Sequence, residues 1–180
     1  DGIPDVFCAS IGLTQKFMTK KITFRENTRC VILEVRKLEG VGYTIDVILI
    51  NGRLKVGDKI MFLTFNGVKT SQIKRIYSPP EGKEIRVKSE LLLNDEIKAS
   101  YSAKIFADDL QNVIAGSRLY NITNLSEEEI KVDKENLELE LETCLKTDSD
   151  IGIHIQTSSM GSMEALLQYC KDNKIKVSSK

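Results

Sequence analysis

The sequence has no tryptophan, one histidine (His154) and only three prolines in 180 residues. Its four cysteines, at positions 8, 30, 144 and 170, are far apart and include no Cys-x-x-Cys pair. One histidine and cysteines at this spacing cannot supply the ligands of a structural zinc site. Four cysteines could form disulfides by count alone, but the high charge and the lack of a secretory segment favour a cytoplasmic protein with buried thiols.

Long apolar runs are also missing. No stretch approaches the roughly 18 consecutive apolar residues that a transmembrane helix requires. The apolar stretch near the start does not resemble a signal peptide, because Asp1 and Asp5 stand where a basic leader would, and polar residues such as Ser10 and Gln15 interrupt it. We therefore expect no membrane partner.

The sequence contains neither a nucleotide-binding motif nor a recognised pattern of catalytic residues. GTP binding of the P-loop type needs a Gly-x-x-x-x-Gly-Lys-Ser/Thr string, and none occurs. The nearest glycine-rich segment, residues 40–42, has no lysine and lies between two predicted strands, which favours a hairpin. His154 falls in a predicted buried strand, and no serine or cysteine pairs with it at a recognised spacing. We interpret it as a structural histidine and predict no catalytic residue, metal ion or cofactor in this chain.

Charge is balanced overall but unevenly distributed. Lysine plus arginine and aspartate plus glutamate both total 26. Residues 25–121 hold 16 basic and 12 acidic side chains, whereas residues 122–180 hold 7 basic and 12 acidic ones. The central part is therefore the more basic one, which is a weak indication that it faces RNA.

Residues 41–60 carry the clearest structural pattern. The odd-numbered residues 45, 47 and 49 are aliphatic and alternate with their neighbours, as in a strand that buries one face. Asn51-Gly52 then predicts a type I′ hairpin turn, in which both residues have positive φ. Gly57 suits a second, left-handed turn beside Asp58, whose side chain is expected to bond the local backbone.

The pattern continues as short strands separated by turn signals, including a second hairpin at Asn66-Gly67 and a helical turn over residues 110–115. Strands at this spacing favour a closed barrel, because closure removes exposed sheet edges. The predicted strands span residues 29–37, 43–50, 59–65, 68–77, 85–88, 98–106 and 118–122.

Helical patterns flank the strands. Near the start, Pro4 suits the first position of a helix, and apolar residues at positions 6, 9, 13 and 17 share one face. This face must lie on the barrel, on another molecule or in solvent. After the strands, Ser126 and Glu129 form a capping box that begins a long charged helix reaching about residue 146.

The last part of the chain has the pattern of a strand, a helix and a strand, over residues 151–157, 162–173 and 175–177. This order predicts a βαβ unit with a parallel strand pair. Ser158 or Ser162 is expected to cap the helix, and the alternative, a phosphate held by amides at the helix start, is less favoured. Two strands do not form a stable sheet alone, so we expect the chain to stop within its last domain.

Several separated segments resemble one family. Residues 30–60, CVILEVRKLEGVGYTIDVILINGRLKVGDKI, resemble the second domain of initiation factor five-B, a family of eukaryotic and archaeal translational GTPases whose bacterial counterpart is initiation factor two. The segments EIRVKSELL, EIKASYSAKI and IAGSRL, at residues 84–92, 96–105 and 114–119, extend this resemblance. Residues 1–18, DGIPDVFCASIGLTQKFM, are similar to the end of the family's GTP-binding domain, and residues 153–171, IHIQTSSMGSMEALLQYCK, to the opening of its third domain.

The resemblance implies a mainly β fold, with a translational-GTPase domain II type β-barrel flanked by an N-terminal helix and a C-terminal partial α/β (βαβ) domain. It divides the chain into the last helix of the GTP-binding domain with a linker (1–24), the domain II barrel (25–121), and a connecting helix with the first part of domain III (122–180). The chain would be an interior fragment of a factor that promotes ribosomal subunit joining. The parent protein would bind GTP and Mg²⁺; this chain would contact the ribosome, its small-subunit RNA, and the GTP-binding and C-terminal domains of the same protein.

Basic side chains of the barrel are the candidate RNA-binding residues. Ile85 and Val87 alternate with Arg86 and Lys88, so both cations would face outward if the aliphatic residues face inward. Together with three cations on the preceding ribbon, they could neutralise RNA phosphates without reading bases. The alternative is that these are ordinary solubilising charges, and it is the family resemblance that favours the RNA interpretation. The full candidate set is Lys69, Lys74, Arg75, Arg86 and Lys88.

Two other interpretations remain open. A free-standing β-barrel adaptor could bind protein partners through the acidic helix over residues 127–142, and it would expose little apolar surface. Another translational GTPase, such as elongation factor Tu or a selenocysteine factor, would share the barrel but differs at the GIPD start and at the TSSMGSMEALL segment.

Overall fold

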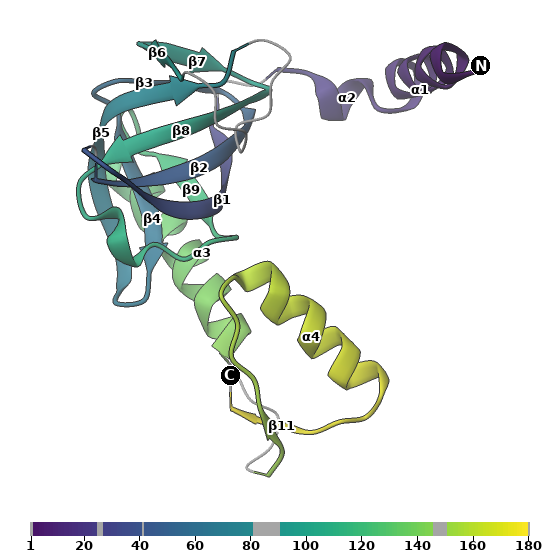
Figure 1. Cartoon of the computed structure of the whole chain (residues 1–180), viewed down its shortest axis with the longest axis vertical. Coiled ribbons are helices and arrows are strands. Elements are labelled where there is room, and N and C mark those ends of the chain that lie inside the picture. The colour runs from purple at the N-terminus through teal and green to yellow at the C-terminus, as the bar shows by residue number, and fades with distance from the viewer. Residues whose placement is uncertain (1, 25–26, 41, 81–90, 146–150, 180) are drawn as a thin grey trace.

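A closed antiparallel β-barrel forms the centre of the protein (Figure 1). The computed structural model describes residues 2–24, 27–40, 42–80, 91–145 and 151–179. Six strands run in the order β4-β9-β1-β2-β8-β5, and β5 pairs again with β4, which closes the barrel and confirms the predicted fold class. The strands are β1 (Arg29–Leu38), β2 (Gly42–Asn51), β4 (Lys59–Thr64), β5 (Gly67–Ser78), β8 (Tyr101–Ala107) and β9 (Arg118–Asn121).

Alternating aliphatic side chains fill the barrel, as the sequence predicts. Ile45, Val47 and Leu49 are fully buried in the core, together with Phe62 of β4. Each large aliphatic or aromatic side chain removed from water in this way contributes roughly 1.5–3 kcal/mol to folding. A short 3₁₀ helix, η1 (Leu110–Asn112), adds Leu110 to this core and confirms the start of the predicted helical turn.

The predicted hairpin at Asn51-Gly52 is wrong. Gly52 has a φ of 82°, but Asn51 is not among the described non-glycine residues with positive φ. The chain instead turns a corner, and the next strand, β3 (Arg53–Lys55), pairs with β7 (Glu96–Lys98). The reason is burial, because Leu54 from this small ribbon is fully enclosed in the barrel core. One further short strand, β6 (Leu92–Asn94), extends the barrel beside β5.

The left-handed turn at Gly57 and the hairpin near residues 40–42 are confirmed, whereas the hairpin predicted at Asn66-Gly67 turns one residue earlier, over residues 65–66. Strands β4 and β5 form a hairpin whose last pair is Thr64 with Gly67, and Gly67 has a φ of 102°. Gly57 has a φ of 94°, and the adjacent Asp58 carboxylate accepts a hydrogen bond from the Lys55 backbone amide at 2.9 Å. Strands β1 and β2 also form a hairpin, closed by the pair Leu38 and Gly42. The predicted strand at 85–88 lies outside the described residues.

The N-terminal helix extends away from the barrel. Helix α1 (Ile3–Phe17) is followed by the short helix α2 (Thr19–Ile22), and Figure 1 shows both reaching outward from one end of the barrel. Val6 and Phe17 on the predicted apolar face are 65% and 71% exposed. The apolar face of α1 therefore lies in solvent in this structure and not on the barrel, which were two of its three predicted locations. Among the described helices, none is long and apolar enough to cross a membrane.

Helix α3 (Glu127–Leu145) packs against the barrel wall. Leu137 is fully buried with Met61 and Leu63 of β4, whose side chains point outward because their neighbours in the strand point inward. The predicted capping box begins the helix. The Ser126 amide donates to the Glu129 carboxylate at 2.9 Å, and the Glu129 amide donates back to the Ser126 hydroxyl at 3.3 Å.

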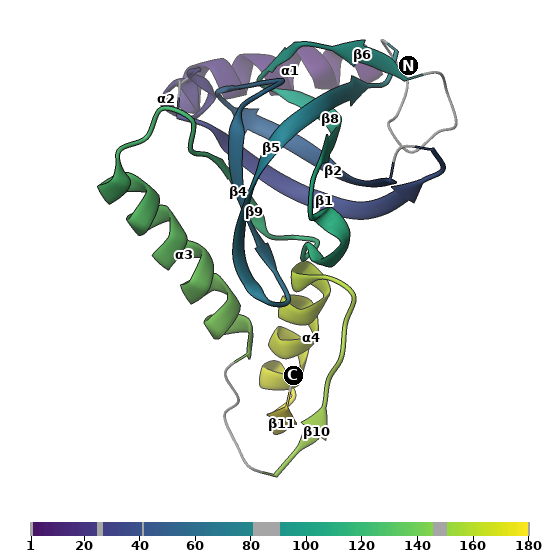
Figure 2. The ribbon, with the colours of Figure 1, turned by 90° about the vertical axis from the view of Figure 1, so that its left-hand side faces the viewer.

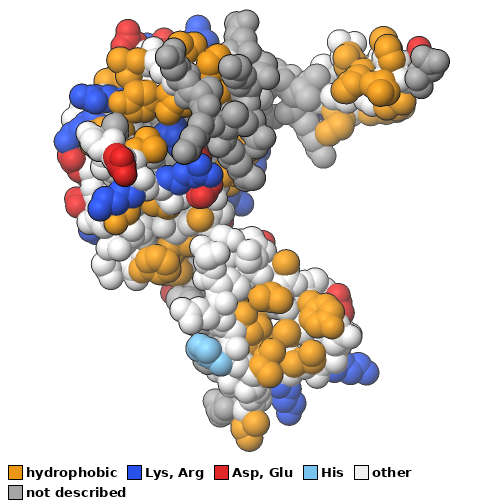
Figure 3. All heavy atoms as spheres, in the orientation of Figure 1, with side chains coloured by type: hydrophobic (Ala, Val, Ile, Leu, Met, Phe, Trp, Pro, Cys, Tyr) orange, Lys and Arg blue, Asp and Glu red, His pale blue; other side chains and the backbone are white. Residues whose placement is uncertain are grey.

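The βαβ unit is confirmed, with a shorter first strand than predicted and a second strand that begins two residues later than predicted. Strand β10 (Ile153–His154) pairs in parallel with β11 (Val177–Ser179), and helix α4 (Met160–Asp172) connects them. The interpretation of His154 as a buried residue is wrong, because its side chain is exposed at the surface (Figure 3). The predicted caps are also wrong, since the Ser159 hydroxyl accepts from the Ser162 amide. Ser159 is the last extended residue, so its side chain alone reaches the first free amides.

The βαβ unit contacts the barrel at the start of α4 (Figure 2). The Met160 amide at the start of α4 donates to the Ala115 carbonyl at 3.0 Å, and the Met160 side chain packs with Met61 and Leu137. Gly116 permits this approach. A Cβ at Gly116 would lie 3.2 Å from the Gly161 nitrogen.

Candidate nucleic-acid interface

The predicted basic residues that the structure describes all lie on β5. Lys74 and Arg75 are neighbours with exposed side chains, whereas Lys69 is half-buried nearer the β4–β5 turn. Arg86 and Lys88 lie outside the described residues. Figure 3 shows lysine and arginine side chains along the edge of the barrel that β5 forms, interleaved with acidic side chains.

A β-bulge explains why two consecutive cations both point outward. Ile73 and Arg75 pair with Ala107 and Phe106 of β8, so Lys74 is an extra residue between them. Bulges of this kind re-aim side chains locally. The Lys74 ammonium forms an exposed ion pair with Asp108 at 2.6 Å, and the Arg75 guanidinium lies 3.4 Å from the Tyr77 hydroxyl.

Lys69 belongs to a different face of the same strand. It lies opposite Phe62, whose side chain points into the core, and directly opposed residues on antiparallel strands share a face. Lys69 and Lys74 are also five positions apart along the strand, which corresponds to about 16 Å. The structure therefore brings Lys74 and Arg75 together and sets Lys69 apart from them.

Beside this pair, the outer wall carries a buried ion pair that the sequence did not reveal. Asp46 of β2 and Lys104 of β8 are paired neighbours, and the Lys104 ammonium donates to the Asp46 carboxylate. Arg36 of β1 approaches the same carboxylate at 3.6 Å and donates to Glu34 at 2.7 Å. This hydrogen bond to Glu34 raises the pKa of Arg36. These cations are neutralised within the wall, so they are poor candidates for binding phosphate.

A second concentration of cations lies in a polar cleft at the β3 end of the barrel. The cleft has a volume of about 390 Å³, and Arg53 and Lys55 of β3 line it together with side-chain amides of Asn27, Asn121 and Asn124. Three separate segments of the chain meet there. The sequence did not identify this cleft, because a hairpin at residues 51–52 would have placed β3 beside β2 and not across the end of the barrel.

Hydrogen bonds between these segments hold the cleft open. The Asp58 carboxylate accepts from the Lys55 amide at 2.9 Å and from the Asn121 side chain at 2.8 Å. The Thr28 hydroxyl donates to the Arg53 carbonyl at 3.3 Å. The walls of the cleft are thus fixed by bonds that leave the Lys55 ammonium on its surface, half-exposed.

Arg118, the first residue of β9, has a structural role. Its guanidinium lies 3.8 Å from the Glu140 carboxylate of α3, and a hydrogen bond with Tyr120 together with this charge raises the pKa of Arg118. Burial raises the pKa of Glu140. This ion pair links α3 to the barrel.

Comparison with known proteins gives consistent matches along the chain. Eukaryotic translation initiation factor 5B of Schizosaccharomyces pombe is 40% identical over 99% of the chain, and that of Homo sapiens is 37% identical over 97%. A crystal structure of GDP-bound aIF5B from Aeropyrum pernix matches 99% of the chain with a TM-score of 0.84 and 27% identity. Almost the whole chain corresponds to a segment of the translation initiation factor 5B family.

The match to initiation factor 5B is confined to one segment of each relative. The chain spans 17% of the length of the fission-yeast factor and 30% of the Aeropyrum chain. A probable translation initiation factor IF-2 from Sulfurisphaera tokodaii is 36% identical over 98% of the chain. No family model matches the chain. The family that the sequence resembles is therefore confirmed, and the closed barrel is the fold that it shares with aIF5B.

Proposed function

We propose that this chain is an interior segment of a cytoplasmic translation initiation factor, in which it docks the factor on small-subunit ribosomal RNA and couples neighbouring domains. The observation that carries the proposal is the match to initiation factor 5B along 99% of the chain together with the shared fold. The parent protein would be a GTPase that binds GTP and Mg²⁺ in a preceding domain and promotes joining of the ribosomal subunits. This chain would contribute no catalytic residue.

We assign the parts of the chain by the same correspondence. Residues 1–24 would end the GTP-binding domain and form a linker, 25–121 would be domain II, and 122–180 would connect to and begin domain III. The exposed apolar face of α1 supports this division, because a helix that ends a larger domain would pack that face inside it. The contact between Met160 and Ala115 supports a coupling role, since it fixes the start of α4 to the barrel.

RNA docking would involve the basic set on the barrel. Lys74 and Arg75 are exposed and adjacent, which suits contact with successive phosphates. Lys69 lies on another face and would have to reach the RNA around the β4–β5 turn. For Arg86 and Lys88 the proposal rests on the sequence pattern and the family.

The docking proposal is tested by the salt dependence of binding to purified small ribosomal subunits. Replacing Lys69, Lys74, Arg75, Arg86 and Lys88 by Gln should reduce the slope of log affinity against log salt by about 1 for each phosphate that is no longer neutralised. A matched control removes five exposed cations outside the barrel, namely Lys16, Lys131, Lys134, Lys171 and Lys176. An unchanged slope in the first variant, or an equal change in both, would remove the proposal.

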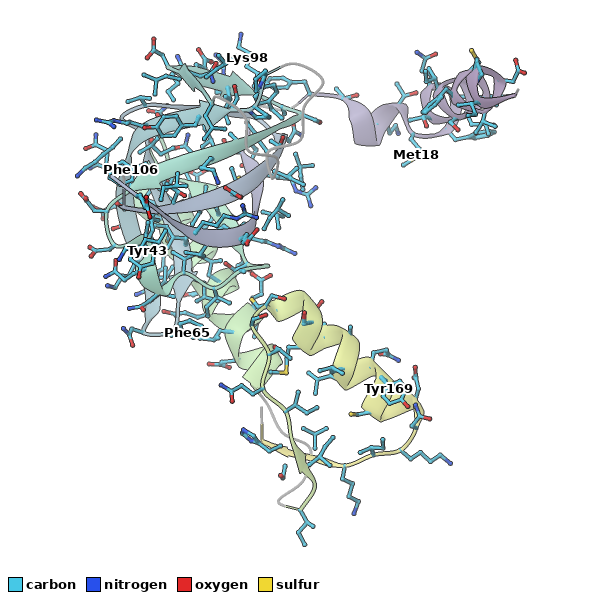
Figure 4. The ribbon with its side chains drawn as sticks, viewed as in Figure 1. Met18, Tyr43, Phe65, Lys98, Phe106 and Tyr169 are labelled. Atoms are coloured by element: carbon cyan, nitrogen blue, oxygen red, sulfur yellow. The ribbon has the colours of Figure 1, made fainter. Side chains whose placement is uncertain are left out.

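The exposed apolar surface argues against the adaptor alternative. A free-standing adaptor should bury its apolar faces, whereas α1 and α4 display them, and Tyr169 of α4 is 60% exposed (Figures 3 and 4). We expect the purified chain to bind an environment-sensitive apolar dye, and to lose most of this signal when Phe7 and Phe17 of α1 are changed to Ser. A monomer without dye binding would favour the adaptor.

A further inference from the structure

We propose that the polar cleft at the β3 end of the barrel binds the ribose-phosphate unit of RNA. This inference rests on the proposed RNA-docking function and adds a second contact site, separate from the basic set on β5. The cleft is the polar hollow of about 390 Å³ lined by Arg53, Lys55, Asp58 and three asparagines. This volume lies within the range of pockets that hold one small ligand.

The two cations suit a phosphate group. Arg53 and Lys55 lie on the same face of β3, because the intervening Leu54 points into the core. Glu96 of β7 lies near both, at 3.8 Å from the Arg53 guanidinium and 3.7 Å from the Lys55 ammonium. Glu96 is thus an ion-pair partner of both cations and lowers the local charge, but at 3.7 Å it makes no hydrogen bond to the half-exposed Lys55 ammonium. A phosphate oxygen at about 2.8 Å would form the stronger, charge-assisted contact.

The remaining walls suit the hydroxyl groups of a ribose. The hydrogen bonds that the Asp58 carboxylate accepts from Lys55 and Asn121 both involve Oδ2, so Oδ1 keeps acceptor capacity for a hydroxyl. In the part of the chain that the structure describes, the side-chain amides of Asn27 and Asn124 have no hydrogen-bond partner. An acceptor beside two cations disfavours a simple inorganic anion and favours a ligand that carries both phosphate and hydroxyl groups. The 2′-hydroxyl is the group that separates RNA from DNA.

Fixed walls make the cleft a preformed site. Its segments come from residues 27–28, 53–58 and 121–124, which are far apart in sequence. The Lys59 amide donates to the Thr123 hydroxyl at 2.8 Å, and the Thr123 amide donates to the Asn121 side chain at 3.0 Å. These bonds hold the two loops at a constant separation, so binding would not have to order them first.

The test measures binding of the purified chain to a single-stranded RNA of about 12 nucleotides and to DNA of the same sequence. Lys55→Ala should weaken RNA binding roughly tenfold at low salt and lower the salt slope by about 1. Asn124→Ala should reduce the preference for RNA over DNA while leaving the salt slope unchanged. Both residues have exposed side chains, and thermal unfolding confirms that each variant folds. Lys171→Ala, on α4, is the matched control and should change binding less than twofold.

The outcomes separate this inference from the docking proposal. The cleft proposal fails if Lys55→Ala and Asn124→Ala bind RNA as tightly as the control Lys171→Ala does. If the variant that lacks the five candidate cations binds RNA more weakly in the same experiment, the docking proposal stands. If only the cleft variants weaken binding, the cleft is the RNA site and the basic set is not. Adenosine monophosphate is added as a competitor. Displacement of RNA that depends on Lys55 shows that a free nucleotide suffices, and no displacement shows that the site needs the RNA chain.

Discussion

Lys104 and Asp46 form an ion pair on the outer wall of the barrel, although they are only 3% and 2% exposed. Both alternate with core residues of their strands and therefore point away from the barrel interior. Burying two charges is unfavourable unless each has its partner. The pair therefore fixes the register between β2 and β8, since a shift by one residue would leave both charges buried without a counter-charge.

Removing one partner should be strongly destabilising. Asp46→Ala would leave the Lys104 ammonium buried without a counter-charge, and we expect a loss of about 3–5 kcal/mol in the free energy of unfolding. The control is Asp108→Ala, which breaks the exposed ion pair with Lys74 and should cost at most about 1 kcal/mol. Urea denaturation measures both. Equal effects of the two substitutions would contradict the structural role of the buried pair.

Gly116 should tolerate a side chain less well than Gly40. Both have positive φ, 91° and 76°, so Ala costs about 1 kcal/mol at either position through backbone strain. At Gly116 the added Cβ also lies 3.3 Å from Met160, whereas at Gly40 it meets nothing within 4 Å. We expect Gly116→Ala to cost about 1–3 kcal/mol more and to expose the Met160 amide to hydrogen exchange. Identical hydrogen exchange of the Met160 amide in the Gly116→Ala and Gly40→Ala variants would show that the packing of α4 on the barrel does not depend on this contact.

The capping box predicts an acid-sensitive start of α3. Hydrogen bonds from Ser126 lower the pKa of Glu129 below its usual 4.5. Because the pKa of Glu129 is lower in the folded state than in the unfolded state, the ionised carboxylate stabilises the fold fully at pH values above its usual pKa. This stabilisation is lost as the pH falls through the lowered pKa of the folded state. The helical circular dichroism signal of wild type should therefore exceed that of Glu129→Gln at neutral pH, and the difference should shrink as the pH falls below 4.5. A difference independent of pH would rule out the ionised cap.

Cysteine reactivity should follow burial. Cys8 on α1 is exposed, whereas burial raises the pKa of Cys30 to about 12. The thiolate is the reactive form, so Cys30 should resist alkylation at neutral pH in the folded chain. In a Cys144→Ser variant, we expect one cysteine of the folded chain to be alkylated rapidly. The additional substitution Cys8→Ser should abolish this rapid alkylation. Rapid labelling of Cys30, detected by peptide mass spectrometry before denaturant is added, would contradict the closed barrel core.

Local patterns identified most elements of the fold. Alternation at residues 45–49 predicted which face of β2 is buried, and Ser126 with Glu129 predicted the start of α3, because neighbours in sequence supply both signals. The same local reasoning was wrong at Asn51-Gly52 and at His154. In each case the deciding contact is distant: Leu54 is buried by the barrel core, and the short pairing of β10 with β11 leaves His154 exposed.

The candidate site was predicted only in part. Lys74 and Arg75 are exposed neighbours as the charge pattern suggested, yet the bulge that turns both outward depends on pairing with β8. The sequence did not identify Arg53 and Lys55 as candidate RNA-binding residues, because nothing in their own segment places Asn121 and Asn124 beside them. A cleft made from three separate segments of the chain exists only after the strands of the barrel have paired.

The sequence by itself determined the barrel strands, the helix start at Ser126, the βαβ order and the family to which the segment corresponds, since these follow from periodicity, caps and matched residues. Only the tertiary structure decided that Asp46 meets Lys104 across 58 residues and that Lys55 shares a cleft with Asn121. The physical reason is barrel closure. Closure brings distant strands into one register, and the charges and hydrogen bonds between them have no counterpart in any local stretch of the chain.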